Sequence, residues 1–366
     1  LNSAKMASYT GPARITNDMG TVIYYGDVAN GQLTGTASQY DTEGNLVYTG
    51  EFLNARYNGY GSQYQNGVLI YEGEFADNLY SGEGTQYDET GAMIYQGGFL
   101  QGERSGTGME YRADTHTLSY YGSFVNGVRE GSGVAYEEDG VTVMYRGDFS
   151  AGLYEGSGSY YQNGVLIYQG QFSQGLFEGS GTLYDAQGNM IYQGDFSKGN
   201  RQGAGTQYDG IGSALYTGTF LDGNVNYIGY LGSTPEDVAA AFGSPGYTAT
   251  VDGRRVLTYL NLGTAFIFAD NGEGLYTCDR VLVDIDENFL QIDRDSTTDE
   301  LEALFGARFT SLELDLTAER KAAFDQLSID VQASGRVDKY LMSTYYIKIY
   351  YDTAGERLAA VECGSY

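Results

Sequence analysis

The chain of 366 residues has no tryptophan, three prolines, one histidine and two cysteines. So few cysteines and histidines leave no Cys/His cluster with metal-site spacing, and no metal or other cofactor is expected. No run of 18 apolar residues occurs, so no transmembrane helix is expected. Positive charge is also scarce, since 20 Lys and Arg stand against 48 Asp and Glu for a net charge of -28. Because such a protein is repelled by phosphate backbones and anionic lipids, we expect no nucleic-acid binding and no direct binding to anionic membranes.

Glycine and tyrosine are plentiful instead, with 54 Gly and 36 Tyr beside 16 Phe. The glycine content is about twice the ordinary share but follows no Gly-X-Y period, which excludes collagen. With 42% hydrophobic residues the chain can bury a core, so disorder is not expected. Glycine combined with tyrosine indicates closely approaching strands with aromatic packing, and such a composition is typical of sequence repeats.

A five-residue core, Tyr-x-Gly-x-Phe, recurs nine times at spacings of 23 to 25 residues. The copies begin at Tyr24, Tyr48, Tyr71, Tyr95, Tyr120, Tyr145, Tyr168, Tyr192 and Tyr216. The triads expected to build the repeat include Tyr48, Gly50 and Phe52; Tyr71, Gly73 and Phe75; Tyr95, Gly97 and Phe99; and Tyr168, Gly170 and Phe172. The last residue of the five-residue core is Phe in every copy except the first, where it is Val28. Spacings this regular show that the first part of the chain is a repeat array.

A second signature, Gly-x-Gly-x-x-Tyr, follows most of these cores, as at Gly59, Gly61 and Tyr64. Turn residues separate the signatures, for example Asn126-Gly127 within a copy and Asn66-Gly67 between copies. Residues 46, 48, 50 and 52 are apolar or glycine and point to one face, while Thr49 and Glu51 point to the other. This period of two predicts a half-buried strand. We therefore predict two-stranded hairpins that stack into one antiparallel sheet, because no hairpin can bury its aromatic face alone.

This pattern resembles the MORN repeat family, in which Tyr-x-Gly-x-aromatic is followed by a polar Asn/Gly stretch and Gly-x-Gly. It departs from the family pattern in carrying Phe where Trp is common. The resemblance implies an elongated, single-layer ribbon of β-hairpins that presents a long face to partners. The family is named for membrane recognition, and some members are credited with phosphoinositide binding. Only nine basic residues occur in the first 230 positions, which disfavours that role here.

The fold is thus predicted to be mainly β, with the repeat array at residues 1–229 and a cap at 9–24. Pro12 in the cap indicates an edge strand that cannot pair further. The chain starts at Leu1 rather than Met; a removed signal peptide or anchor and a trimmed fragment are the alternatives. After Tyr230 the rhythm stops, and we expect a small α+β domain of two tandem units, 230–292 and 293–366.

The two C-terminal units begin with the same helix signal, 63 residues apart. Thr234 and Pro235 predict the start of the first helix and Gly243 its end, and Thr297 and Gly306 hold the equivalent places in the second. Strands are predicted at 247–251, 255–261, 264–270 and 275–285 in the first unit, and at 337–342, 344–352 and 356–363 in the second. An extra helix is predicted at about 318–327.

The segment from Gly232 to Pro245 is similar to the opening of small outer-membrane lipoprotein domains of the SmpA/OmlA type. Two copies in tandem look like the β-lactamase-inhibitor-protein-like fold, in which helices pack on an antiparallel sheet. The resemblance implies a non-catalytic domain of the cell envelope. It also puts Cys278 and Cys363 on the last strand of their units, where a disulfide and two separate buried thiols both remain open.

No set of residues for catalysis stands out. The single histidine, His116, falls in a turn and is expected to face solvent. The Gly-x-Gly pairs lie within strands and do not open helices, so they are not nucleotide-binding loops. Asp-rich turns offer oxygen ligands for calcium, but no EF-hand pattern occurs. Most acids of the array occupy repeat positions expected to face water, namely Glu51, Glu72, Glu74, Asp148 and Asp195.

Three tyrosines, Tyr57, Tyr80 and Tyr154, fall between the two strand signatures and are the candidate binding surface. Tyrosine suits contacts with proteins or sugars. We therefore predict a non-enzymatic scaffold that binds protein partners, located in a bacterial cell envelope or secreted. A carbohydrate- or cell-wall-binding module is the alternative, although the lack of Trp weighs against sugar stacking. A membrane-lipid-associated MORN protein is a further alternative, which the net charge disfavours.

Overall fold

The computed structural model describes residues 8–287, 289–313, 316–331, 335–354 and 357–366. As predicted, the fold is mostly β: an open antiparallel sheet of 19 strands is followed by an eight-stranded sheet with a few helices. The chain divides into two compact units, residues 1–176 with 186–188, and residues 177–185 with 189–366. The second unit therefore contains the last hairpins of the array together with the C-terminal domain.

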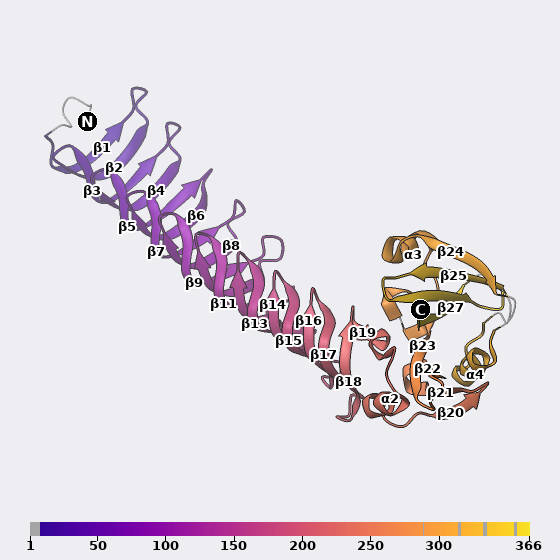
Figure 1. The fold of residues 1–366 in the computed structure, drawn as a ribbon. Helices are drawn as coiled ribbons and strands as arrows, with labels where there is room; N and C mark the ends of the chain where they lie inside the picture. The colour runs from indigo at the N-terminus through magenta and orange to yellow at the C-terminus, as the bar shows by residue number, and fades with distance from the viewer. Residues whose placement is uncertain (1–7, 288, 314–315, 332–334, 355–356) are drawn as a thin grey trace. The chain divides into compact units, whose positions relative to one another are not determined.

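The 19-stranded sheet consists of one added strand and nine hairpins (Figure 1). The added strand, β1 (Gly11–Thr16), carries Pro12 and pairs with the first hairpin. The first strands of the hairpins are β2 (Val22–Ala29), β4 (Leu46–Leu53), β6 (Val68–Ala76), β8 (Met93–Leu100), β10 (Leu118–Val125), β12 (Val143–Ser150), β14 (Val165–Ser173), β16 (Met190–Ser197) and β18 (Ala214–Leu221). The second strands are β3 (Gln32–Tyr40), β5 (Arg56–Gln65), β7 (Leu79–Tyr87), β9 (Glu103–Tyr111), β11 (Val128–Tyr136), β13 (Leu153–Gln162), β15 (Leu176–Tyr184), β17 (Asn200–Tyr208) and β19 (Asn224–Val225).

In seven of the hairpins the strand register shifts beside the repeat glycine. Between β4 and β5, Gly50 pairs with Gly61 and Phe52 pairs with Tyr57, so three residues of β5 stand opposite one residue of β4. Gly59 lies inside this bulge with a φ of +78°, a left-handed conformation in which a side chain is strained. The first glycine of the Gly-x-Gly signature is therefore required by the backbone.

The second glycine of the signature is required by packing. A Cβ atom on Gly61 would lie 2.2 Å from the hydroxyl oxygen of Tyr48, and one on Gly133 would lie 2.3 Å from that of Tyr120. No real side chain tolerates such distances, so the ring of the repeat tyrosine occupies the space that the glycine leaves free. In copies two to six and in copy eight, a glycine pair forms a floor under the repeat tyrosine. The first copy has Ala37 opposite Gly26.

The repeat tyrosines and phenylalanines form a buried ladder. Tyr48 meets Phe52 of its own strand edge-on, with 5.1 Å between ring centroids, and meets Phe75 of the next hairpin edge-on at 5.2 Å. The repeat tyrosines are all at most 2% exposed. Edge-to-face ring pairs stabilise by about 0.5–1.5 kcal/mol beyond the area they bury. Each hairpin therefore depends on the next one to cover its tyrosine.

The hydroxyl group explains why the buried ring is tyrosine rather than phenylalanine. Tyr48 donates its hydroxyl hydrogen to the carbonyl oxygen of Glu51 at 3.0 Å, and Tyr120 does the same to Ser123 at 3.2 Å. This carbonyl lies opposite the bulge, where the ladder of backbone hydrogen bonds is interrupted. All nine repeat tyrosines make this bond to the carbonyl three residues further on. The hydroxyl thereby satisfies a backbone acceptor in a buried place.

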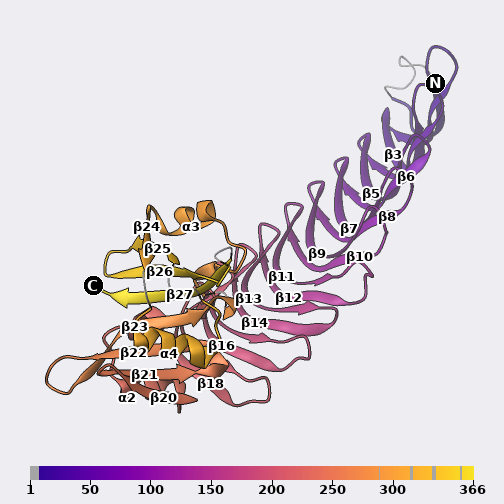
Figure 2. The ribbon, with the colours of Figure 1, turned by 90° about the vertical axis from the view of Figure 1, so that its right-hand side faces the viewer.

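The C-terminal domain contains one antiparallel sheet in the order β20-β21-β22-β23-β27-β26-β25-β24. Its strands are β20 (Tyr247–Val251), β21 (Arg254–Tyr259), β22 (Thr264–Asp270), β23 (Tyr276–Asp284), β24 (Arg308–Glu313), β25 (Gly335–Leu341), β26 (Tyr345–Tyr351) and β27 (Leu358–Ser365). The helices are α2 (Pro235–Phe242), α3 (Thr298–Phe305) and α4 (Ala318–Leu327), with short 3-10 turns η1 (Tyr227–Tyr230), η2 (Leu260–Leu262), η3 (Ile285–Glu287) and η4 (Phe289–Gln291). Helix α4 packs against β20, β21 and β22 (Figure 2).

The two tandem helices begin with the same capping box. Thr234 exchanges hydrogen bonds with Asp237 at the start of α2, and Thr297 does so with Glu300 at the start of α3. These reciprocal bonds satisfy two backbone donors at each helix start. The strand β24 was missing from the predicted elements. It is an edge strand paired only with β25 among the described strands, so its sequence need not carry the apolar run of a central strand.

The helix α2 also covers the last rung of the ladder. The ring of Phe242 stacks on Tyr216 with centroids 4.8 Å apart and planes 13° apart. The hydroxyl oxygens of Tyr216 and Tyr230 lie 3.2 Å apart. The ninth copy has a second strand of only two residues, β19, with Val225 opposite Phe220. The C-terminal domain therefore supplies the stacked ring that the second strand supplies in other copies.

The two cysteines are free, buried thiols. They lie on β23 and β27, as the resemblance implied, but the register places Val281 opposite Cys363. Burial raises the pKa of Cys278 and of Cys363. Of the two arrangements left open by the sequence, the structure has the separate thiols.

Candidate functional site

The candidate tyrosines Tyr57, Tyr80 and Tyr154 lie at the start of the second strand of their hairpins, not in a loop between the strands. Each ring stacks on the repeat tyrosine of its copy. The centroid distances are 3.8 Å for Tyr57 on Tyr48, 3.7 Å for Tyr80 on Tyr71, and 3.8 Å for Tyr154 on Tyr145. The candidates are half-buried, so each side chain packs in the ladder and keeps part of its surface accessible to solvent.

Arginine takes the same position in other copies. The guanidinium carbon of Arg104 lies 4.6 Å from the ring centroid of Tyr95, and that of Arg129 lies 4.7 Å from Tyr120. Arg201 covers Tyr192 at 5.5 Å. We call the covering residues of the first unit, Tyr57, Tyr80, Arg104, Arg129 and Tyr154, the lid row; Arg201 holds the same place in a hairpin of the second unit. What they share is a planar group, which packs on a ring face as an aromatic side chain or as a cation.

The lid row carries one cluster of charges. Glu110 accepts hydrogen bonds from Arg104 at 2.7 Å and from Arg129 at 2.6 and 2.8 Å. The three side chains are between 19% and 29% exposed, and they join three successive hairpins because Arg104 also donates to Gln86. Burial raises the pKa of Tyr120 to about 12, although the charge of Arg129 opposes the shift. The cluster gives the middle of the lid row a positive charge in an acidic protein.

The sequence contained a signal for the arginines that single-residue reasoning missed. When the copies are aligned on the repeat tyrosine, the lid position follows the first turn in each of them. A search for tyrosine alone at that position finds Tyr57, Tyr80 and Tyr154 and overlooks Arg104 and Arg129. Whether the three tyrosines contact a partner stays a prediction.

Some acids of the array accept hydrogen bonds from backbone N–H groups besides facing water. Glu51 accepts a hydrogen bond from the backbone N–H of Tyr60 at 3.1 Å, and Asp195 accepts one from Ala204 at 3.2 Å. These N–H groups lie in the bulges, where strand pairing is interrupted. Glu51, Glu74, Asp148 and Asp195 are exposed as predicted, whereas Glu72 is half-buried. Across the described residues, no three His, Cys, Asp or Glu side chains are grouped as metal ligands.

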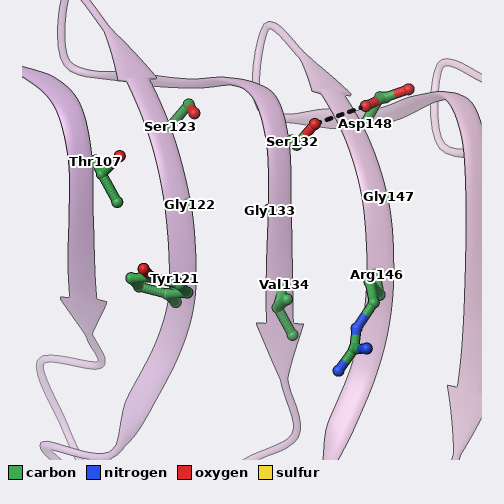
Figure 3. A pocket seen from close by; sticks show the side chains of 10 residues that line it. All are labelled: Thr107, Tyr121, Gly122, Ser123, Ser132, Gly133, Val134, Arg146, Gly147 and Asp148. Atoms are coloured by element: carbon green, nitrogen blue, oxygen red, sulfur yellow. Dashed lines mark hydrogen bonds between the residues drawn. The ribbon is translucent and has the colours of Figure 1, made fainter.

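The face of the sheet opposite the ladder has a shallow pocket of about 480 Å³ over β10, β11 and β12 (Figure 3). Tyr121, Val134 and Arg146 form one row of side chains across these strands, and Ser123, Ser132 and Asp148 form a second row. The backbone of three glycines lies between the rows. Ser132 donates a hydrogen bond to Asp148 at 3.1 Å, and the Tyr121 side chain is 47% exposed. Hydroxyls, a carboxylate, a guanidinium and a ring edge thus surround one small depression.

Two other places carry side chains of the kinds that catalyse reactions or bind anions. His116 is exposed in the turn between β9 and β10, as predicted, with a φ of +56°. Three arginines, Arg294, Arg336 and Arg357, line a pocket of about 430 Å³ near the start of α3. Each is paired with an aspartate, namely Asp286, Asp338 and Asp295 respectively. Among the described residues that line this pocket, none of the arginines is therefore free to bind an anionic ligand.

A hairpin array with one buried tyrosine per hairpin defines a class of repeat protein, and the comparison with family models names it. The MORN repeat model matches seven segments, residues 48–68, 71–93, 95–117, 120–140, 145–165, 168–190 and 192–214. This part of the chain is a MORN repeat array, as the sequence motifs indicated. The first copy, with Val28, and the shortened ninth copy lie outside the matched segments. MORN repeats in general mediate interactions with proteins or membranes and are not enzymes.

No curated protein matches the chain. One solved structure with a likeness is an extracellular protein containing a SCP domain from Bacillus anthracis, at 13% identity and a TM-score of 0.25. The match covers 40% of this chain and 48% of that one, so the chain spans about half of that protein. Another is a protein assigned as a 6-phosphogluconolactonase from Bacteroides uniformis, at 12% identity and a TM-score of 0.13, covering 84% of this chain and 78% of that one. None of the helices in the described part of the chain has the length and apolar character needed to span a bilayer.

Proposed function

We propose that the protein is a non-enzymatic scaffold whose repeat array binds partner proteins along the lid row. The observation that carries this proposal is the difference between the buried repeat tyrosine and the lid residue that stacks on it. The hydroxyl of the buried tyrosine is bonded to its own backbone, whereas the residue stacked on it is only half-buried. Tyrosine and arginine are the residue types most often found at the energetic centres of protein interfaces. The array repeats them at the hairpin spacing.

We also place the protein in the cell envelope of a bacterium or outside the cell, with the C-terminal domain as a second interaction module. The support is the resemblance of residues 232–245 to envelope lipoprotein domains. Fractionation of cells that express the protein with its native flanking sequence tests this placement. Recovery in the cytoplasmic fraction alone would contradict it.

The lid row is tested by photo-cross-linking in cells of the native organism. A cross-linking amino acid at position 57, 80 or 154 is expected to capture the same discrete partner from all three positions. Val141, which is 78% exposed in a turn connecting two hairpins, is the control position and should capture nothing discrete. A partner captured only from position 141, or no partner from the three lid positions, would show that the lid row is not the binding surface.

A matched substitution separates binding from stability. Tyr80→Arg keeps a planar lid over Tyr71, because the array itself uses Arg104 and Arg129 there. We expect it to leave the free energy of unfolding within about 1 kcal/mol of wild type. It should weaken binding of the cross-linked partner at least tenfold. Equal binding by Tyr80→Arg and wild type would remove Tyr80 from the surface.

A second candidate function, binding of a glycan, is favoured by the pocket in Figure 3. A tyrosine ring beside a carboxylate, a guanidinium and hydroxyls suits a sugar. On a glycan array we expect micromolar binding that Tyr121→Ala abolishes. Tyr25→Ala is the matched control, because Tyr25 also follows a repeat tyrosine, and is 64% exposed. Binding that both substitutions leave intact would contradict a site at this pocket.

Flotation with anionic liposomes tests the membrane alternative, which salt-sensitive binding would support.

A further inference from the structure

The pocket in Figure 3 lies where the face opposite the ladder departs from its repeat pattern. The strand register joins residues of that face into one continuous row across the sheet. In copies two and three the members of this row are polar, namely Thr49, Ser62, Glu72 and Thr85. At the pocket and on the strand before it, the members are Met109, Tyr121, Val134 and Arg146. Beyond the pocket the row is polar again, with Ser159 and Gln169.

The acids that recur on this face are absent at the same place. The residue before the repeat phenylalanine is Glu51 in copy two, Glu74 in copy three and Asp148 in copy six. Copies four and five carry Gly98 and Ser123 there instead. The residues that line the pocket therefore include one acid and one base, and exposed charges more than about 8 Å away are largely screened at physiological salt. A negative charge on a ligand is repelled less here than on the rest of this face.

Arg146 is the cation of the pocket, and it is exposed. Within the described part of the chain its guanidinium forms no ion pair, whereas Arg104 and Arg129 are paired with Glu110. A guanidinium presents parallel N–H donors that match the two oxygens of a carboxylate. Arg146 can therefore bind an anionic group of a ligand without first breaking a contact within the protein.

The pocket offers a different chemistry on each of its two sides. Arg146 and Asp148 are two residues apart on β12, so the two rows that border the pocket lie about 6.6–6.8 Å apart. Val134 lies opposite Arg146, and Tyr121 lies opposite Val134, which places an apolar surface beside the cation. On the other side the Ser132 hydroxyl and the Asp148 carboxylate are hydrogen-bonded to each other. A ligand that contacts both sides needs an anionic group at one end and hydroxyls at the other.

This arrangement favours a sugar acid over other small anions. The two charges of an α-amino acid lie on one carbon, too close together to contact both rows. A uronic acid carries its carboxylate on one side of a six-membered ring and hydroxyls on the other side. Its C–H groups can pack against the ring of Tyr121, which is 47% exposed. The pocket volume of about 480 Å³ falls within the range of about 300–1,000 Å³ that is usual for ligand sites.

We propose that the pocket binds a sugar that carries a carboxylate, of the uronic acid class. The carboxylate pairs with Arg146, the ring packs on Tyr121 and Val134, and the hydroxyls bond to Ser132 and Asp148. This inference rests on the second candidate function, because it names the class of sugar for the same pocket.

The test uses the full chain and two matched probes, the disaccharide glucuronosyl-xylose and its methyl ester, titrated by calorimetry. The probes share every hydroxyl and differ in the charge of one carboxyl group. The free acid should bind saturably. The ester should bind about tenfold more weakly or worse, because it cannot form the charge-assisted hydrogen bonds to Arg146.

Three variants assign the contacts. Arg146→Gln introduces the residue that copies four and seven carry at this position, Gln96 and Gln169, so the fold should be retained and circular dichroism should match wild type. It should lower the affinity for the acid to that for the ester and leave the ester unaffected. Asp148→Asn should weaken both probes to the same extent, because they share the hydroxyls. Arg56→Gln is the control, since Arg56 is paired with Asp77 outside the pocket, and it should bind the acid like wild type.

The outcomes separate this inference from the candidate function on which it rests. Equal binding of acid and ester, or a preference for the acid that Arg146→Gln leaves unchanged, would overturn the inference but leave glycan binding in place. Acetate that competes as well as the disaccharide would show that any carboxylate suffices, which would overturn the sugar. If neither disaccharide binds while neutral glycans bind through Tyr121, the class of sugar is wrong. If no glycan binds at all, the candidate function fails together with the inference.

Discussion

Replacing Tyr120 with alanine is expected to destabilise the array by about 3–5 kcal/mol, the range for removal of a large buried aromatic side chain. The ring lies over the glycine floor at Gly133 and beneath the guanidinium of Arg129. It also contacts Phe124 at 5.3 Å and Phe149 at 4.9 Å between centroids. Alanine therefore removes the contacts on every side of one rung. Urea unfolding followed by far-UV circular dichroism measures the loss.

The number of transitions in the unfolding curve reports how strongly neighbouring copies are coupled, which its midpoint does not. The stability of a repeat array is close to a sum over copies and the interfaces between neighbours. A broken rung in the middle should therefore separate the hairpins before it from those after it, and a single transition should become two. A curve that stays single, with a free energy of unfolding within about 1 kcal/mol of wild type, would show that the ladder does not carry the coupling between copies.

Tyr120→Phe is the control for this substitution. It keeps the ring and its edge-to-face contacts but deletes the hydrogen bond to the carbonyl of Ser123. A single hydrogen bond of this kind contributes about 0.5–1.5 kcal/mol. The phenylalanine variant should therefore unfold in one transition and lose much less stability than Tyr120→Ala.

The architecture of the array could be predicted from the sequence because its signals are local. Gly61 lies 13 residues from the ring of Tyr48, within one hairpin, and the same residues return in every copy. Periodicity thus predicted the hairpins and the tyrosine over glycine. The lid row was only partly predicted, because its members share planarity rather than a residue type. Arg104 and Tyr80 fill the same place with different chemistry.

Features that depend on tertiary contacts were beyond the sequence. The helix starting at Pro235 was predicted from its cap, but its sequence does not indicate that Phe242 stacks on Tyr216. The edge strand β24 pairs on one side with β25, so it lacks the apolar run that marks a buried strand. The buried ion pair between Arg320 and Glu362 joins residues 42 positions apart, and charged residues are assigned to the surface by default.

Breaking that ion pair is expected to have the largest effect in the C-terminal domain. Glu362 is fully buried on β27 and accepts hydrogen bonds from Arg320 at 2.6 and 2.8 Å. It also accepts from the hydroxyls of Tyr346 at 2.7 Å and Tyr350 at 3.0 Å. Glu362→Gln leaves the nearly buried guanidinium without a counter-charge, which costs about 3–5 kcal/mol. Thermal and urea unfolding, followed at the transition of the C-terminal domain, measure the loss in free energy of unfolding.

The acid sensitivity of the domain should change with it. Burial by itself raises the pKa of Glu362, but the hydrogen bonds and charge of Arg320 outweigh burial and hold the pKa below its usual value of 4.5. A carboxyl with a depressed pKa contributes stability that is complete above the unfolded pKa and is lost as the pH falls through the folded pKa. The wild-type domain should therefore lose stability below about pH 4.5, and Glu362→Gln should show a shallower loss in that range.

A variant that removes the whole network distinguishes an unpaired charge from lost packing. In R320M/E362L/Y346F/Y350F the four side chains that exchange these hydrogen bonds become apolar at similar volume, so none of the four bonds leaves one partner buried alone. Such replacements are often neutral or stabilising, and the variant should be more stable than Glu362→Gln by several kcal/mol. If it is as unstable as the single variant, the network itself holds α4 on the sheet. If Glu362→Gln costs less than about 1 kcal/mol, the guanidinium has found another partner and the pair is not what fixes the helix.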